Sequence, residues 1–212
     1  VINADPREII FTSGATESDN MALKGVAEMY KSKGNHIVTS SIEHKAIIDS
    51  AKRLETWGFD VTYIDPPDDG ITSLKMIENA IREDTILVSI MHANNEIGVI
   101  NPIEEIGKFC HEKGILFHTD ATQGFGKVPI DVNEMGIDLL SATAHKVYGP
   151  KGIGMLYVRR RKPRVRLSAI IDGGGHERGM RSGTLNVSGI VGFRKAAELC
   201  SEEMESETIR LT

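Results

Sequence analysis

The sequence predicts an α/β protein with a mainly parallel central sheet and helices on both faces. Short apolar segments alternate with segments of helical periodicity along the 212 residues. One apolar run, residues 86–91, is continuous, which is typical of parallel strands that are buried on both faces. Hydrophobic residues make up 40% of the chain and charged residues 26%. This globular balance excludes disorder and low-complexity arrays.

The first third of the chain predicts three strands and two helices. The small and polar residues 13–17 form a turn from the first strand into the first helix. The second helix has Ile47, Ala51 and Leu54 on one face. Residues 66–70 contain two prolines and a glycine, which end the third strand. The expected strands are 8–12, 36–40 and 61–64, and the expected helices run from the 13–17 turn to about residue 33 and over 45–57.

The sequence after residue 70 predicts four more strands and three helices. Gly114 directly follows one of these helices, at the position where glycine commonly ends a helix. There is no internal repeat and no linker-like stretch, so the chain reads as one unit. The expected strands are 86–91, 115–119, 138–142 and 152–158, and the expected helices are 74–82, 103–113 and 189–211.

Composition excludes several classes of protein. A net charge of −5 disfavours a dedicated nucleic-acid binder. Two cysteines exclude a disulfide scaffold and fit a reducing compartment. No apolar run is long enough to span a membrane, and residues 1–11 lack the features of a signal peptide. One segment, residues 159–166, is strongly basic. It is either a solvated strand edge or a contact for RNA, phosphate or an acidic protein.

In a parallel sheet, ligands bind in the loops at the carboxyl ends of the strands. The first strand is followed by residues 12–17, which suit a phosphate at a helix N-terminus or form a simple N-cap. Four later strand ends also carry polar or ionisable groups, at 41–44, 92–96, 120–123 and 143–146. Walker, dinucleotide, nucleophile-elbow and metal-ligand spacings are all absent from the sequence.

Lys146 is the most suggestive of these residues. A lysine beside a buried strand end is unusual, and a lowered pKa would make it an amine nucleophile. Together with Asp120, it supplies the lysine and the carboxylate that pyridoxal 5′-phosphate (PLP) enzymes need. The alternative is a surface lysine in front of the turn at 148–152.

Six stretches of the sequence resemble the cysteine desulfurases of the IscS/NifS-like group. The match covers essentially the whole chain in order, and the motifs are jointly very specific. They are FTSGATES at 11–18, EHK at 43–45, NNEIG at 94–98, HTDATQ at 118–123, HKVYGPKG at 145–152 and GGGHERGMRSGT at 173–184.

The resemblance implies a fold-type I PLP enzyme of the class V aminotransferase superfamily that works as a homodimer. Its reaction converts L-cysteine to L-alanine and passes the sulfur as an enzyme persulfide to an iron–sulfur scaffold or another sulfur acceptor. Residues 1–212 are then an incomplete PLP-binding large domain, without the N-terminal segment and the C-terminal small domain. The expected location is cytoplasmic, or mitochondrial if a targeting segment lies upstream.

The resemblance also implies roles for individual residues. Lys146 attaches the cofactor and transfers protons, and Asp120 holds the pyridine nitrogen protonated. His44 stacks on the ring and is a candidate acid or base. The other implied cofactor contacts are Asn95 and Gln123 at the phenolic side of the ring, Ala15, Thr16, Thr143, Ala144 and His145 around the phosphate, and Thr184, which reaches the partner subunit's phosphate from a dimer-crossing loop. Relatives commonly have Ser where this chain has Thr143, and the hydroxyl group is retained.

Neither cysteine fits the persulfide position of the family, which lies in a small-residue loop far beyond the PLP lysine. Cys110 and Cys200 both fall in expected helices and are predicted to be structural. This chain alone is therefore expected to bind PLP but to be inactive in sulfur transfer. The alternatives are a selenocysteine lyase, another class V PLP enzyme, or a non-catalytic truncated module.

Overall fold

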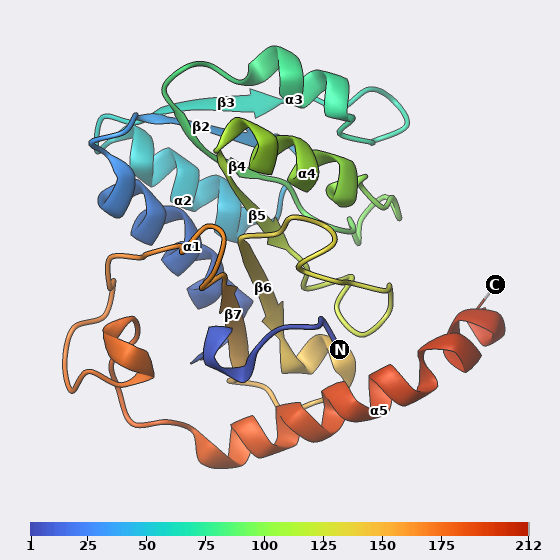
Figure 1. The fold of residues 1–212 in the computed structure, drawn as a ribbon. Coiled ribbons are helices and arrows are strands. Elements are labelled where there is room, and N and C mark those ends of the chain that lie inside the picture. The colour runs from blue at the N-terminus through green and yellow to red at the C-terminus, as the bar shows by residue number, and fades with distance from the viewer. Residues whose placement is uncertain (212) are drawn as a thin grey trace.

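The computed structural model describes residues 1–211 and shows one seven-stranded sheet between two layers of helices (Figure 1). This confirms the α/β fold class. The strands are β1 (Ile9–Thr12), β2 (His36–Ser40), β3 (Asp60–Ile64), β4 (Thr85–Ser89), β5 (Leu116–Asp120), β6 (Leu139–Thr143) and β7 (Gly154–Val158). The helices are α1 (Ala15–Tyr30), α2 (Lys45–Glu55), α3 (Leu74–Ala80), α4 (Ile103–Lys113) and α5 (Val187–Leu211), with short 3-10 helices η1 (Pro6–Glu8), η2 (Ala144–Val147) and η3 (Glu177–Gly179).

The strand order is β1-β7-β6-β5-β4-β2-β3. Strands β3, β2, β4, β5 and β6 pair in parallel, as predicted. Strand β7 pairs antiparallel with both β6 and β1. Residues 144–153, which connect β6 to β7, are too few for the crossover that a parallel pair requires. The chain therefore turns back directly, and the carboxyl ends of β1, β2, β4, β5 and β6 share one edge.

Helix and strand boundaries follow the predicted ones closely, with differences at the ends. Helix α1 ends at Tyr30, three residues before the expected end. Glu8, expected in the first strand, instead closes η1, where it forms a capping box with Asp5. Gly114 ends α4 in the left-handed conformation, as expected from its position (φ 70°).

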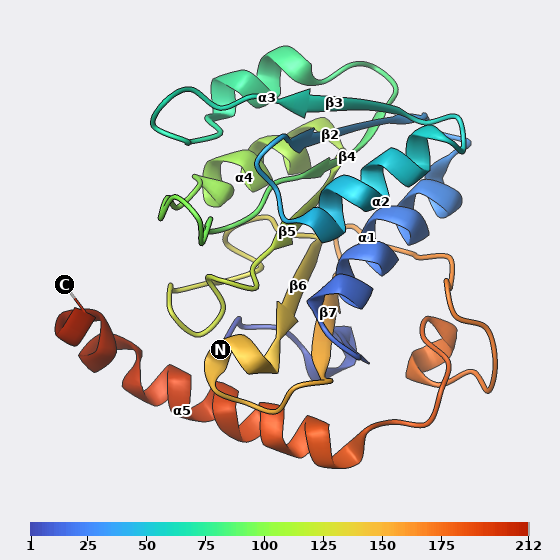
Figure 2. The same cartoon turned by 180° about the vertical axis from the view of Figure 1, so that it is seen from behind.

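Each face of the sheet has its own apolar core. On one face, α1 and α2 contribute residues such as Leu23 and Leu54 to the core. On the other face, α3, α4 and the first turns of α5 contribute residues such as Ile77, Ile106 and Phe193. Figure 2 shows α1 and α2 crossing one side of the sheet, while α5 runs along the lower end and extends away from it. Among residues 1–211, no helix has both the length and the hydropathy needed to cross a membrane.

The basic segment at 159–166 is not uniformly exposed. Arg159 is buried, and its guanidinium lies 3.1 Å from Asp138 and donates hydrogen bonds to the backbone carbonyls of Val132 and Ile137. Arg159 is therefore structural, because a buried guanidinium requires this kind of pairing. The charge available at the surface is carried by the rest of the segment: Arg160, Arg161, Lys162, Arg164 and Arg166.

Candidate active site

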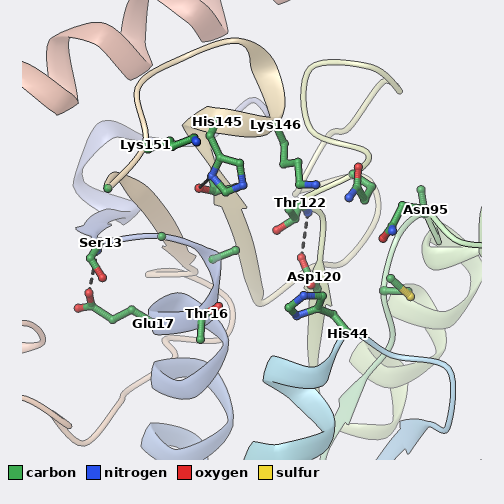
Figure 3. Close-up of a pocket in the computed structure, with 17 residues that line it drawn as sticks. Ser13, Thr16, Glu17, His44, Asn95, Asp120, Thr122, His145, Lys146 and Lys151 are labelled. Atoms are coloured by element: carbon green, nitrogen blue, oxygen red, sulfur yellow. Dashed lines mark hydrogen bonds between the residues drawn. The ribbon is translucent and has the colours of Figure 1, made fainter.

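A cavity of about 540 Å³ opens at the carboxyl edge of the sheet (Figure 3). Small-molecule sites in proteins have volumes of roughly 300–1,000 Å³, so the cavity is large enough for a cofactor. The segments after β1, β2, β4, β5 and β6 all contribute to it. The cavity brings together all but two of the site residues that the sequence predicts. Those that line it are Ala15, Thr16, His44, Asn95, Asp120, Gln123, Thr143, His145 and Lys146.

One side of the cavity is the N-terminus of α1. Ala15 and Thr16 are the first residues of this helix, so their backbone N–H groups have no acceptor within it. The N-cap residue is Gly14, which has no side chain to accept hydrogen bonds from these N–H groups. Free N–H groups and the positive end of the helix dipole together favour an anion such as a phosphate.

Polar and basic side chains complete this side of the cavity. Figure 3 shows His145 and Lys151 facing the first turn of α1. The Thr143 hydroxyl group lies 3.1 Å from Nδ1 of His145 and donates to the carbonyl of Ile153. Partial burial and the positive charges of Lys146 and Lys151 lower the pKa of His145. The electrostatic environment here favours a ligand with negative charge.

Close packing between α1 and β7 holds the helix N-terminus in place. The buried hydroxyl group of Ser18 donates to the carbonyl of Met155 (2.9 Å) and lies 2.8 Å from the Thr12 hydroxyl. A Cβ atom at Gly154 would lie 2.6 Å from the backbone of Gly14. Only glycine lets β7 approach the 13–17 turn this closely.

The carboxyl group of Asp120 lies on the other side of the cavity. Its Oδ1 accepts a hydrogen bond from the backbone N–H of Thr122 (2.9 Å), which fixes its orientation (Figure 3). Asp120 is only 4% exposed and forms no salt bridge with any residue in 1–211. Burial raises its pKa, whereas the Thr122 hydrogen bond and the nearby His44 ring lower it. A buried carboxyl group without an ion-pair partner favours a cationic ligand.

His44 is the N-cap residue of α2, and this position determines its tautomer. Its Nδ1 accepts a hydrogen bond from the backbone N–H of Ala46 (3.1 Å). Because Nδ1 is the acceptor, the neutral ring carries its proton on Nε2. Figure 3 shows the ring beside the Asp120 carboxyl group. The helix cap thus orients an imidazole N–H donor at the cavity.

A second buried polar layer lies beneath Asp120. His118, two residues earlier on β5, places its two ring nitrogens 2.8 Å from the Ser89 hydroxyl and 3.0 Å from the Ser141 hydroxyl. Asp19 on α1 lies 3.8 Å from the same ring and is fully buried. Burial and the charge of Asp120 raise the pKa of Asp19 well above its ordinary value, and burial lowers the pKa of His118 to about 3. The His118 ring is therefore neutral near pH 7, and burial favours the neutral form of Asp19.

Lys146 lines the cavity but is not buried, contrary to the expectation from its place beside a buried strand end. It lies in η2, which turns the chain outward after β6. The residues of η2 that face the core are Ala144 and Val147, which are both buried. Figure 3 shows the Lys146 side chain extending into the cavity towards Thr122.

Two predicted site residues do not reach the cavity. Ala144 packs in the core, and its backbone N–H donates to Ile153 instead of pointing into the cavity. Thr184 is exposed and lies outside the cavity. The loop before Thr184 is anchored by Arg181, which donates a 2.7 Å hydrogen bond to Glu17.

Several residues that line the cavity had no individual role predicted from the sequence. Thr122 is two residues from Asp120, and Lys151 lies in the glycine-flanked turn after Lys146. Closeness in the sequence to Asp120 and Lys146 was the feature that could have predicted their place in the cavity. Met91 and Ala93 gave no such signal, because an apolar side chain near a strand end is ordinary core. The lining residues without an individually predicted role are Ser13, Gly14, Glu17, Met91, Ala93, Thr122, Lys151 and Gly152.

The two cysteines lie away from the cavity. Cys110 is fully buried on α4, where burial and the charge of Asp138 raise the pKa of its thiol to about 12. Cys200 is partly buried on α5, with its Sγ 3.8 Å from the Val147 carbonyl, and burial raises its pKa as well. A high thiol pKa disfavours the reactive thiolate. No group of His, Cys, Asp and Glu side chains within 1–211 is arranged to hold a metal ion.

The chain matches the aminotransferase class V family over residues 1–211. The chain belongs to this family. Class V aminotransferases, cysteine desulfurases included, are PLP-dependent enzymes. The match covers every element of the fold that carries the cavity.

Individual class V relatives are named as cysteine desulfurases. The chain is 63% identical to cysteine desulfurase IscS of Proteus mirabilis (strain HI4320) and 62% identical to that of Pseudomonas entomophila (strain L48). Each match covers 100% of this chain and 52% of the relative, so the chain spans about half the length of these relatives.

Solved structures of the family have the same fold. A structure described as SspA in complex with cysteine has a TM-score of 0.88 and 50% identity, and the match covers 93% of this chain and 56% of that one. A NifS-like protein has a TM-score of 0.91 and 45% identity, covering 97% and 56% of the two chains.

The buried layer beneath Asp120 predicts a specific dependence of stability on pH. The unfolded His118 ring binds a proton near pH 6.5, whereas the folded ring does so only near pH 3. Between these values the unfolded chain holds one more proton at this position, so stability falls as the pH falls. The slope from His118 alone is up to about 1.4 kcal/mol per pH unit.

Urea unfolding of the wild type and of His118→Gln between pH 4 and pH 6 measures this slope. Gln retains hydrogen-bonding groups for the two serines but has no titrating ring. The variant should therefore lose stability less steeply on acidification than the wild type. Equal slopes in the two proteins would show that His118 is not held neutral.

Proposed function

We propose that this chain is the PLP-binding large domain of a cysteine desulfurase that converts L-cysteine to L-alanine. The observation that carries the proposal is the pairing of two opposite features in one cavity. An anion-favouring helix N-terminus faces one side, and a buried carboxyl group without an ion-pair partner faces the other. PLP has the matching groups, a phosphate and a pyridine nitrogen that becomes cationic on protonation.

The residues present fit this cofactor. The backbone N–H groups of Ala15 and Thr16, with Thr143, His145 and Lys151, would hold the phosphate. Asp120 would accept a hydrogen bond from the ring nitrogen and stabilise its positive charge. Asn95 and Gln123 would contact the phenolic side of the ring. Ala144 is left out of this set, because its N–H group is used within the fold.

When bound, PLP supplies an electron sink that allows bonds at the α- and β-carbons of an amino acid to break. The residues of this chain supply orientation and proton transfer. Lys146 would hold the cofactor through Nζ, and its amine would carry a proton to and from the substrate carbon. His44 would pack against the ring and present its Nε2–H group as a hydrogen-bond donor to a departing group.

We propose neither cysteine of this chain as the residue whose thiol receives the sulfur. Cys110 is fully buried, Cys200 is partly buried, and neither lines the cavity. We therefore infer that residues 1–212 bind the cofactor without completing sulfur transfer. The supporting comparison is that the named IscS relatives are about twice its length.

A homodimer and a cytoplasmic location complete the proposal. The exposure of Thr184 and the anchoring of its loop by Arg181 support a role for Thr184 at the partner subunit's phosphate. Two free cysteines and no disulfide within residues 1–211 support a reducing compartment, with the mitochondrion as the alternative to the cytoplasm. An iron–sulfur scaffold or another sulfur acceptor is the proposed partner.

The first test concerns Lys146. Addition of PLP to the wild-type chain should give a yellow protein whose visible band persists through gel filtration and yields a stable adduct after borohydride reduction. Lys146→Ala should lose both, because the amine that we propose to hold the aldehyde is removed. Lys151→Ala should keep the band at saturating PLP and bind more weakly, because it removes only a phosphate contact. A reducible adduct in Lys146→Ala would overturn the assignment.

The second test concerns the exposed part of the basic segment, which we propose as the binding surface for an acidic partner protein. Arg161, Lys162 and Arg164 are all exposed. Replacing all three by Gln should weaken binding of poly-L-glutamate by roughly tenfold at low salt, and the difference should shrink as salt is added. Replacing the exposed Lys31, Lys45 and Lys75 makes the same change in net charge and should have little effect. Equal weakening in the two triple variants would remove the idea of a specific surface.

A further inference from the structure

Two loops at the cavity are joined by the side chains that directly precede His44 and Asn95. One loop follows β2 and the other follows β4. Oε1 of Glu43 accepts a hydrogen bond from the backbone N–H of Met91 (2.7 Å). In the opposite direction, Nδ2 of Asn94 donates to the backbone carbonyl of Ile42 (3.0 Å). Each loop therefore holds the other through one side chain.

Both side chains lie behind the cavity and not in its lining. Glu43 and Asn94 are each 7% exposed, and neither lines the cavity. Their neighbours His44 and Asn95 do line it (Figure 3). A hydrogen bond made in a buried place is costly to lose, because its partner is left without water or another acceptor. The two bonds are thus placed to fix the loops without touching a ligand.

The two ends of the Asn94 side chain have separate roles. Oδ1 accepts hydrogen bonds from the backbone N–H groups of Glu96 (2.8 Å) and Ile97 (3.3 Å), which form the turn within its own loop. Nδ2 makes the bond to the other loop. A substitution that keeps the oxygen and removes the NH₂ group therefore separates the turn from the connection between the loops.

The connection extends to the strand that carries Asp120. The backbone N–H of His92 donates to the Asp120 carbonyl (3.0 Å), and Nδ2 of Asn101 donates to the Met91 carbonyl (2.8 Å). The β4 loop is consequently fixed against β5, and the β2 loop is fixed against the β4 loop. His44, Asn95 and Asp120 are held in one frame.

Glu43 needs no charge for this role. Burial and the nearby charge of Asp120 raise its pKa well above the ordinary value, so the neutral acid is favoured. The carbonyl oxygen of a neutral acid can also accept the hydrogen bond from Met91. The amide of glutamine has the same shape and the same acceptor.

We propose that Glu43 and Asn94 form a loop clamp: they are positioning residues that hold His44 and Asn95 at the cavity for the cofactor. This inference rests on the proposed PLP site. The clamp acts before the cofactor binds, because its hydrogen bonds are formed by protein groups alone. Its loss allows the two loops to separate, and the cofactor then has to order them on binding.

Hydrogen exchange of the full chain without cofactor tests whether the clamp exists. The Met91 N–H should be protected in the wild type and in Glu43→Gln, and should exchange much faster in Glu43→Ala. Glu96→Gln is the matched control, because Glu96 is an exposed carboxylate in the same loop. It should leave Met91 protection unchanged. Equal protection in the wild type and in Glu43→Ala would overturn the clamp.

PLP affinity, measured by the visible band, tests the positioning role. Loss of one buried hydrogen bond should raise the Kd for PLP about tenfold in Glu43→Ala and in Asn94→Asp. The Asn94→Asp variant keeps the oxygen that forms the turn. Glu43→Gln should stay within about twofold of the wild type. The double variant should weaken binding by less than the product of the single effects, because both bonds join the same two loops.

The outcomes separate the clamp from the proposed function. If the wild-type chain does not bind PLP, the proposed site fails and the positioning role fails with it. If the wild type binds and Glu43→Ala has the same Kd, only the positioning role is overturned. Equal weakening by Glu43→Gln and Glu43→Ala would also contradict it. Should Glu43→Ala fail to fold, Asn94→Asp breaks the second bond of the clamp and gives the same test.

Discussion

Parallel pairing of β2, β4, β5 and β6 is the constraint on which the rest of the structure depends. Because these strands run in one direction, their following loops emerge at one edge of the sheet. Residues that are far apart in the sequence, such as His44, Asp120 and Lys146, line one cavity for this reason. The antiparallel β7 closes the other side, where Gly154 lets it pass close to the N-terminus of α1. The helix N-terminus and the strand ends thus face each other across the cavity.

The protonation of the buried carboxyl groups explains how the fold can hold several of them close to one cavity. Three buried carboxyl groups lie near one another, those of Asp19, Glu43 and Asp120. Only Asp120 lines the cavity, and burial favours the neutral form of the other two. Of these three, Asp120 alone is therefore available to a cationic ligand in the cavity. The loop clamp adds positional order to this arrangement, because it joins the loops that border the Asp120 side.

Much of the fold and of the site could be predicted from the sequence because the signals are local. Apolar runs marked the strands, and polar residues at their ends marked the cavity. What could not be predicted depends on contacts between distant residues. Arg159 looked like part of an exposed basic segment, but its partner Asp138 lies on the neighbouring chain segment before β6. Glu43 and Asn94 lie in strand ends and motifs that the sequence singled out, but their role could not be predicted, because it consists of bonds to the backbone of another loop. The exposure of Lys146 depends on the outward turn of η2, and the local sequence left both a buried and a surface position open for this lysine.

The most direct test of the account is the position at which PLP becomes attached to the wild-type chain. Lys146 and Lys151 line the cavity, and Lys127 is close enough for the Lys146 charge to lower its pKa. Three lysines therefore compete for the aldehyde. Borohydride reduction followed by peptide mapping should find the cofactor mass on Lys146 at a stoichiometry near one. Modification spread over Lys127, Lys146 and Lys151, or concentrated on either of the other two, would contradict the proposed site.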